Sequence, residues 1–300
     1  MIKSVVAVIF ITVFLIVSCS KTPRLEKVAG GLNFPEGPAW DGKGNVYISN
    51  CYADWIGLLT TGGIDTFVIK ATMPYNFGKT NGLVFNRDGF LYACDYENGA
   101  IIRFSADGRC ELVTGGFEGQ RFNRPNDLAF SKKGDLYFTD PHTYDPENRD
   151  GIVYQYSFKT GNVRPVYQGL AFPNGIAFSA DGKSLFVGES ALNRVIEFPV
   201  DEEGNLGNYH VFAEIPGGDP DGLALDQAEN VYVAHFGGGK VYKFNPEGLV
   251  ADTINMPGKK PTNVEFGDDD LCTLYITESE TNAIYRIRVT TPGLKLFSLP

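Results

Sequence analysis

The sequence predicts an all-β chain folded as a six-bladed β-propeller of four-stranded blades. The main observation is a short motif in which a polar residue, flanked by Pro or Gly, leads into an apolar strand. Its six copies begin at Phe34, Thr80, Pro125, Phe172, Pro220 and Pro261. They are spaced by about 41–48 residues, the period expected of propeller blades. Two further observations support this fold: aromatic runs within each repeat, and an unpaired strand before the first copy.

Each repeat can be written as four strands, A to D. Strand A follows the polar residue, and strand B is an aromatic run such as residues 136–138. Strand C is the next run, such as residues 195–198, and strand D leads to the following repeat. Short β-branched and aromatic runs between Gly, Asp and Asn clusters are typical of strands. Turn positions that need a positive φ are expected at Gly89, Gly134, Gly182 and Gly204.

The two ends of the chain predict how the ring closes. The last repeat supplies three strands, at residues 263–266, 274–277 and 284–289. The strand at residues 25–29 has no blade before it. We expect it to complete the last blade, because closure removes exposed strand edges. The propeller domain is therefore predicted to span residues 25–300, although the tail at 293–300 carries no strand pattern.

The first residues predict export. Lys3 precedes an apolar run at residues 5–17, which is typical of a signal peptide and short for a membrane span. Residues 16–19, Ile-Val-Ser-Cys, resemble the lipobox of bacterial lipoproteins. The resemblance implies a signal peptide at 1–18, lipid on Cys19 and a tether at 19–24; an ordinary secretory signal is the alternative. We expect a monomeric cell-envelope lipoprotein, on the periplasmic side or in the outer membrane, held to the membrane only by its lipid.

Charge, cysteine spacing and a missing motif argue against several classes of partner, metal site and enzyme. The net charge is −10, which argues against nucleic acid or an anionic membrane surface as a partner. Cys51, Cys94, Cys110 and Cys272 lack CxxC spacing, so a zinc site is not expected. An exported chain can form disulfides, but free thiols are the favoured interpretation. The chain has no Gly-Xaa-Ser-Xaa-Gly motif, which disfavours a serine hydrolase.

Oxygen-bearing side chains recur where strand A starts and strand B ends, positions that are neighbours in an antiparallel pair. We expect both sets at one mouth of the channel. The starts of strand A carry Glu36, Asn81, Asn126, Asn174, Asp221 and Thr262. The ends of strand B carry Asn50, Asp95, Asp140, Glu189, His235 and Glu278. Converging carboxylates favour a divalent cation, and oxygen donors suit Ca²⁺ or Mg²⁺. The alternative is that Pro-Asn-Gly and Pro-Asp-Gly mark ordinary turns.

Several motifs together resemble the SMP-30/gluconolactonase/luciferin-regenerating-enzyme-like family over nearly all of the exported part. They are residues 34–38 (Phe-Pro-Glu-Gly-Pro), 124–127 (Arg-Pro-Asn-Asp), 173–175 (Pro-Asn-Gly), 219–222 (Asp-Pro-Asp-Gly) and 274–277 (Leu-Tyr-Ile-Thr). The resemblance implies a six-bladed propeller that hydrolyses lactones with a divalent cation in its channel. It implies metal ligation by Glu36, Asn174 and Asp221, and substrate contact by Arg124 and Asn126, with Asn126 as a further candidate ligand. It also implies that Asp221 is the catalytic base.

The expected cation is Ca²⁺, with Mg²⁺, Mn²⁺ and Zn²⁺ as alternatives. The cation would polarise the lactone carbonyl, and the attacking water would be deprotonated by Asp221 or by the cation itself. Arg124 would hold a substrate oxygen, or instead pair with a loop acid. His142 and His235 are interpreted as a loop residue and a packing residue. Two other functions stay open: a surface-tethered propeller that binds without catalysis, and a metal-dependent phosphotriesterase or arylesterase.

Overall fold

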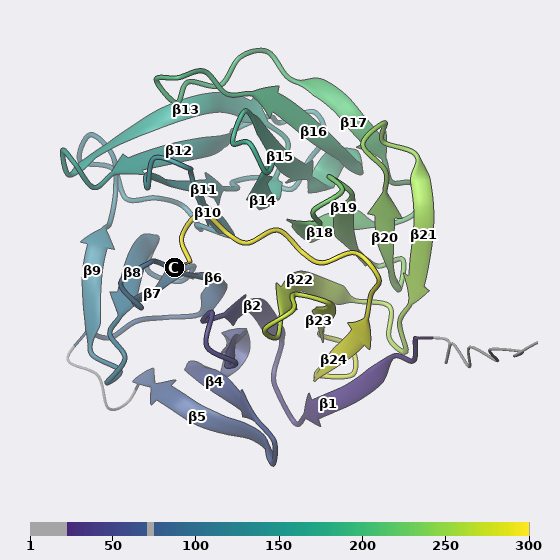
Figure 1. The fold of residues 1–300 in the computed structure, drawn as a ribbon. Helices are drawn as coiled ribbons and strands as arrows, with labels where there is room; N and C mark the ends of the chain where they lie inside the picture. The colour runs from purple at the N-terminus through teal and green to yellow at the C-terminus, as the bar shows by residue number, and fades with distance from the viewer. Residues whose placement is uncertain (1–22, 71–74, 300) are drawn as a thin grey trace, which may run out of the picture.

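Six four-stranded antiparallel sheets form a ring around a central channel in the computed structural model, which describes residues 23–70 and 75–299 (Figure 1). This confirms the predicted six-bladed propeller. The sheets are, from the inner strand outward, β2 (Pro35–Trp40), β3 (Val46–Asn50), β4 (Trp55–Thr60), β5 (Gly63–Ile69); β6 (Thr80–Phe85), β7 (Leu91–Asp95), β8 (Ala100–Phe104), β9 (Cys110–Thr114); β10 (Leu128–Phe130), β11 (Leu136–Asp140), β12 (Gly151–Ser157), β13 (Asn162–Leu170); β14 (Pro173–Phe178), β15 (Ser184–Glu189), β16 (Arg194–Pro199), β17 (His210–Glu214); β18 (Asp219–Leu225), β19 (Val231–Phe236), β20 (Lys240–Phe244), β21 (Val250–Asn255); and β22 (Pro261–Gly267), β23 (Thr273–Glu278), β24 (Ala283–Arg288), β1 (Glu26–Gly30). Short 3₁₀ turns, η1 (Cys51–Ala53) and η3 (Ser190–Leu192), follow β3 and β15.

The first strand closes the ring, as expected. Strand β1 pairs antiparallel with β24, with Glu26 opposite Arg286 and Gly30 opposite Ala283. Outside the described ranges lie the predicted signal peptide and most of the predicted tether, including Cys19, so these stay predictions. In the described ranges, no helix has the length and apolar character needed to cross a bilayer.

A repeated aromatic pair joins neighbouring blades. A tyrosine on the second strand of one blade packs edge-on against a phenylalanine of the next inner strand. The pairs are Tyr47–Phe85, Tyr92–Phe130, Tyr137–Phe178 and Tyr232–Phe266, with ring centroids 5.0, 5.2, 5.1 and 5.1 Å apart. Edge-to-face pairs stabilise beyond the apolar area that they bury. The aromatic runs of these four repeats therefore hold one blade to the next.

The inner strands carry a β-bulge at the motif. Pairing shifts between Glu36 and Ala39 in β2, and β6, β14, β18 and β22 shift at the same place. A bulge re-aims the side chain that it contains, and bulges are common beside active sites. In these five motifs the polar residue stands inside a bulged strand and not in an ordinary turn, whereas Asn126 of the remaining motif precedes β10. The turn glycines expected at 89, 134, 182 and 204 do have positive φ, between 74° and 86°.

The motif glycine allows the inner strands to approach each other. A Cβ added to Gly175 would collide with the Asp221 carbonyl oxygen and lie 2.8 Å from the Cα of Gly222. A Cβ added to Gly222 would collide with the side chain of Asn263. Gly82, Gly175 and Gly222 have no positive φ, so close approach around the axis is what excludes a side chain there.

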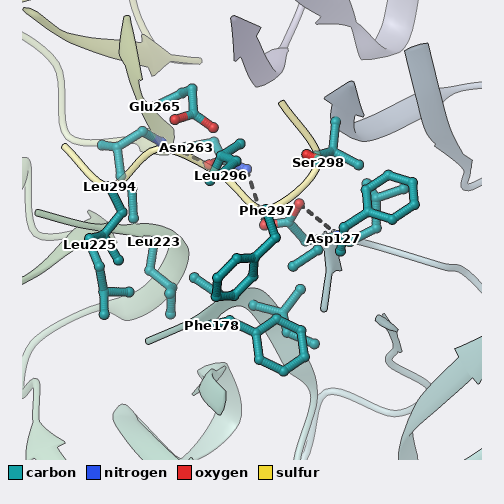
Figure 2. Close-up of a pocket in the computed structure, with 18 of the residues that line it drawn as sticks. Asp127, Phe178, Leu223, Leu225, Asn263, Glu265, Leu294, Leu296, Phe297 and Ser298 are labelled. Atoms are coloured by element: carbon teal, nitrogen blue, oxygen red, sulfur yellow. Dashed lines mark hydrogen bonds between the residues drawn. The ribbon is translucent and has the colours of Figure 1, made fainter. Parts of the chain in front are cut away.

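The C-terminal tail, which carried no prediction, folds back across the channel (Figure 1). Leu294 N donates to Leu225 O at 2.9 Å, and Arg87 Nε donates to Phe297 O at 2.9 Å. Figure 2 shows Leu294, Leu296, Phe297 and Ser298 above the inner strands, where they enclose a cavity of about 80 Å³. The tail therefore covers the end of the channel at which the inner strands finish.

Removal of residues 293–300 should destabilise the protein, because it uncovers the apolar ends of the inner strands. Four apolar tail side chains would lose their contacts, a loss of about 3 kcal/mol or more. We expect the midpoint of thermal unfolding to fall by roughly 5 °C or more, with increased binding of a dye that reports exposed apolar surface. The control is Lys295→Ala, which changes an exposed tail residue. An unchanged midpoint in the truncated protein would contradict this role.

The four cysteines in the described ranges are free, as favoured from the sequence. Cys51 and Cys94 are buried, whereas Cys110 and Cys272 are partly exposed. Burial raises the pKa of the Cys110 thiol to about 12, with the nearby Asp95 and Glu111 carboxylates adding to the effect. A thiol of this kind stays protonated and unreactive at neutral pH.

Candidate metal and substrate site

A cavity of about 240 Å³ lies at the end of the channel where the inner strands begin. The polar residues of the first five motifs line it together. They are Glu36, Asn81, Asn126, Asn174 and Asp221. The sixth motif residue, Thr262, does not line it; its hydroxyl donates to Pro35 O at 2.7 Å and links two blades. The structure thus brings together all four residues expected as metal ligands.

Neighbouring blades hold the backbone under these side chains. Thr139 Oγ1 donates to Asn174 O at 2.7 Å, and Gly82 N donates to Asn126 O at 2.8 Å. Ser49 Oγ donates in the same way to Asn81 O at 2.6 Å. Each bond joins two adjacent blades. The cavity floor is therefore built by rigid strands whose relative positions are fixed, as a precise binding site requires.

Two buried carboxylates face each other on the cavity floor. Glu36 is 3% exposed and Asp221 is 7% exposed. Burial raises the pKa of Glu36 well above its ordinary value, and repulsion from Asp221 and Asp127 adds to this. Burial likewise raises the pKa of Asp221, with repulsion from Asp127 and Asp219, while a hydrogen bond from Asn174 opposes the shift. A bound cation would relieve this repulsion.

The donor set fits a hard divalent cation. It consists of two carboxylates and neighbouring amide oxygens, which are the ligands that Ca²⁺ and Mg²⁺ prefer. In the described parts of the chain, no group of three or more His, Cys, Asp or Glu side chains is suited to a metal. The two-carboxylate, amide-rich floor is the candidate cation site.

The expected second ring of acids, at the ends of the second strands, is not part of the cavity. These side chains accept backbone N–H groups of the preceding loops. Asp140 accepts from Asn123 N and Arg124 N, at 3.0 and 2.7 Å, and Glu278 accepts from Lys260 N at 2.8 Å. Asn50, Asp95 and Glu189 accept in the same manner from Asn33, Gly78 and Ala171. The prediction that these side chains line the channel mouth is wrong, because their oxygens accept hydrogen bonds from the backbone N–H groups of the loops.

His235 is also outside the cavity, buried against Tyr242 at a ring distance of 5.2 Å. Burial lowers the pKa of His235, which keeps the imidazole neutral. His142 lies in the loop after β11, half-exposed, with Nε2 3.4 Å from Asp140 Oδ2. Both histidines thus fit the packing and loop interpretations made from the sequence.

Arg124 stands beside the cavity and does not line it. Its guanidinium donates to the Tyr96 hydroxyl at 3.3 Å and to His142 O at 2.7 Å. Tyr96 does line the cavity, and the guanidinium carbon lies 5.8 Å from its ring centroid. Within the described ranges Arg124 makes no ion pair, so the alternative of a salt bridge to a loop acid is wrong.

Aromatic side chains form most of the cavity wall, and sequence reasoning missed them. They are Phe34, Tyr52, Tyr96, Tyr144, Phe172 and Phe236. Their positions did carry a signal. Phe34 and Phe172 each precede a motif polar residue by two positions. Tyr96 directly follows the second strand β7, and Phe236 is the last residue of the second strand β19. Cys51, Ser190 and Asp219 complete the lining.

The family model described as SMP-30/Gluconolactonase/LRE-like region matches residues 34–280. The chain belongs to this family. A gluconolactonase of Zymomonas mobilis subsp. mobilis is 29% identical over 300 residues, covering 90% of this chain and 82% of that protein. Diisopropyl-fluorophosphatase of Loligo vulgaris is 27% identical, covering 92% and 95%. The solved structure of a Xanthomonas campestris gluconolactonase is 26% identical with a TM-score of 0.79, covering 89% and 90%.

Proposed function

We propose that this protein is a divalent-metal-dependent hydrolase of lactones, with metal and substrate bound in the channel cavity. One observation carries the proposal: Glu36 and Asp221 are buried together, beside Asn126 and Asn174, in one cavity of a propeller of this family. Two of the similar proteins are gluconolactonases, which supports lactones as the substrate class. A scaffold without a ligand would gain nothing from two repelling carboxylates.

The proposed cation ligands are Glu36, Asn174 and Asp221, with Asn126 as a fourth. Ca²⁺ is the first choice because all the donors are oxygens; Mg²⁺, Mn²⁺ and Zn²⁺ are the alternatives. When bound, the cation would supply Lewis-acid polarisation of the substrate carbonyl. Asn81, which lines the same cavity, would orient the substrate or an ordered water.

Asp221 is the proposed general base. Its carboxylate would accept a proton from water as the water oxygen adds to the carbonyl carbon. When the ring C–O bond breaks, the proton would pass to the departing ring oxygen, leaving a hydroxy acid. Asn174, hydrogen-bonded to Asp221, would fix the orientation of the carboxylate. Asn126 would orient the substrate, and Arg124 would hold a substrate oxygen after leaving Tyr96.

The proposal is tested by following acid release from a panel of lactones. The protein is stripped with EDTA and then supplied separately with Ca²⁺, Mg²⁺, Mn²⁺ or Zn²⁺. We expect hydrolysis only after a cation is restored. Equal rates with and without EDTA, or no hydrolysis of any lactone with any cation, would overturn the proposal.

A phosphotriesterase activity is the second candidate. It is supported by the similarity to diisopropyl-fluorophosphatase over nearly the whole chain. The same floor could act on a P=O group in place of a carbonyl. Including a phosphotriester and an aryl ester in the panel separates these reactions. If neither these nor the lactones react but Ca²⁺ still binds, the surface-tethered binding propeller becomes the preferred function.

Cation binding should release protons and should tighten as the pH rises. The raised pKa values of Glu36 and Asp221 mean that the metal-free pair retains protons above the ordinary carboxyl range. The cation binds the deprotonated forms, so those protons must leave. Calorimetric titration with Ca²⁺ between about pH 6 and pH 8, in buffers of different ionisation enthalpy, measures their number. Binding with no proton release at any pH would contradict the raised pKa values.

We also propose that the chain is exported and held to the cell envelope by lipid on Cys19, as a monomer. The lipobox-like residues 16–19 support this location. Substitution of Cys19 by Ala should move the protein from the membrane fraction to the soluble fraction and abolish labelling with a fatty acid. Unchanged labelling in that variant would exclude Cys19 as the lipid site.

A further inference from the structure

The cavity wall differs in chemistry from its floor. The floor carries carboxylates and amides, whereas six aromatic rings stand above it: Phe34, Tyr52, Tyr96, Tyr144, Phe172 and Phe236. Tyr52 and Tyr144 are 50% and 55% exposed, so the wall continues to the surface. A substrate whose carbonyl reaches the floor must therefore place the rest of its structure among these rings.

Several polar groups of the wall are already paired within the protein. The Tyr144 hydroxyl and Asn193 Nδ2 both donate to Asp219 Oδ1, at 2.8 and 3.0 Å. Ser190 Oγ donates to Pro220 O at 2.7 Å, and the Tyr96 hydroxyl accepts from Arg124. A polyhydroxylated sugar would lose hydration here and find few partners, which disfavours its binding.

The rings are held in place before any ligand arrives. Phe34 contacts Tyr52 and Phe236, with ring centroids 4.7 and 6.4 Å apart, and Tyr144 contacts Phe172 at 5.3 Å. Phe34 and Phe172 have φ values of 59° and 58°, in the left-handed region that phenylalanine rarely adopts. Such strain persists only where surrounding contacts maintain it, and it concentrates at ligand sites. The aromatic wall is thus preorganised.

We infer that the preferred substrates are hydrophobic lactones, which carry an aromatic or alkyl substituent, and not polyhydroxylated sugar lactones. The apolar substituent packs against the aromatic wall, and its burial supplies binding free energy that a polyol would not gain. The inference rests on the proposed lactone hydrolysis for the reactive end of the substrate. The placement of the apolar end depends on the wall alone.

The test compares six-membered lactones that differ only in their substituents: one with a phenyl group, one with an alkyl chain, and glucono-δ-lactone. Each kcat/KM is divided by the rate of base hydrolysis without protein. We expect the phenyl and alkyl lactones to exceed glucono-δ-lactone by at least about tenfold. Metal-dependent hydrolysis with glucono-δ-lactone equal or preferred would overturn this inference while leaving the proposed function intact.

Tyr52→Ala and Phe236→Ala should reduce the preference, through a loss that is at least about tenfold greater for the phenyl lactone than for glucono-δ-lactone. The matched control is Phe158→Ala, which removes a partly exposed ring outside the cavity. This variant should leave the preference for the phenyl lactone over glucono-δ-lactone unchanged. Calorimetry with the corresponding unreactive lactams gives a readout without turnover. If no lactone is hydrolysed, tighter binding of the phenyl lactam that weakens in Tyr52→Ala still supports the aromatic wall. Equal binding of the phenyl lactam and of the lactam that corresponds to glucono-δ-lactone, or no binding of either one, overturns the inference.

Discussion

Asp221→Asn and Glu36→Gln should each reduce metal-dependent lactone hydrolysis by at least about 10³-fold while leaving the β-sheet circular dichroism unchanged. Each variant keeps the size of the side chain and removes one charge from the cation site. Loss of the base alone is worth about 10²–10⁴ in rate, and weakened cation binding adds to it. Steady-state kinetics at saturating Ca²⁺, with calorimetric Ca²⁺ titration of the same variants, separates lost binding from lost chemistry.

The control for both variants is Glu265→Gln, a carboxyl in the tail-side cavity that lies among the channel-lining residues (Figure 2). Burial raises the pKa of Glu265 to about 8, so its neutral form, which glutamine imitates, predominates at neutral pH. We expect near-normal activity from this variant. Substantial activity in both Asp221→Asn and Glu36→Gln would remove the proposed mechanism.

The same two variants should be more stable than the parent protein when no cation is present. The folded-state pKa values of Glu36 and Asp221 lie above ordinary values of 4.5 and 3.8. A raised carboxyl pKa lowers stability as the pH rises from the ordinary value towards the folded-state value. Replacing the acid by its amide removes that penalty, so the gain should be absent at low pH and appear as the pH rises. Thermal unfolding in EDTA at several pH values measures it.

Gly175→Ala should strongly lower the free energy of unfolding, although it adds only one methyl group. The new Cβ would collide with the Asp221 carbonyl oxygen and crowd the Cα of Gly222 at 2.8 Å. Because these are backbone atoms of the next inner strand, no side-chain rotation relieves the overlap. We expect a destabilisation of about 3 kcal/mol or more, together with weaker Ca²⁺ binding, because the displaced strand carries Asp221.

The matched control for Gly175→Ala is Gly62→Ala, an exposed glycine whose added Cβ would meet nothing closer than Thr60 Oγ1 at 3.9 Å. Chemical denaturation of both variants gives the comparison. Similar midpoints for the two would show that the inner strands can separate without penalty. The role assigned to the motif glycines would then be wrong.

The repeat allowed both the ring and its cavity floor to be predicted. Each copy places a polar residue at an equivalent point of an inner strand, so Glu36, Asn174 and Asp221 had to converge once six blades closed. The second-strand acids recur equally regularly, and periodicity alone could not separate the two sets. Asp140 faces a loop because the backbone N–H groups of Asn123 and Arg124 donate to its carboxylate. The positions of these N–H groups follow from the loop conformation, which the repeat does not predict.

The aromatic wall and the tail were harder to predict for different reasons. The wall residues come from loops and strand ends of several repeats, and no spacing relates Tyr144 to Phe34. The tail lies outside the repeat, and its Leu-Lys-Leu-Phe sequence has no strand partner to indicate a position. Its contacts with Leu225 and Arg87 arise only because ring closure brings those residues to one face.

Closure of the last sheet by β1 has a consequence for biosynthesis. The side chains of Glu26 and Arg286 are joined across 260 positions of the chain, so β1 must wait for a partner strand that is synthesised much later. Contacts between distant positions form slowly, since a long segment must be ordered first. Until β24 has been made, β1 has no partner, and its unpaired edge can recruit a strand from another molecule. Newly made chains should therefore be most vulnerable to aggregation in the interval when five sheets are complete and β1 has not yet paired with β24.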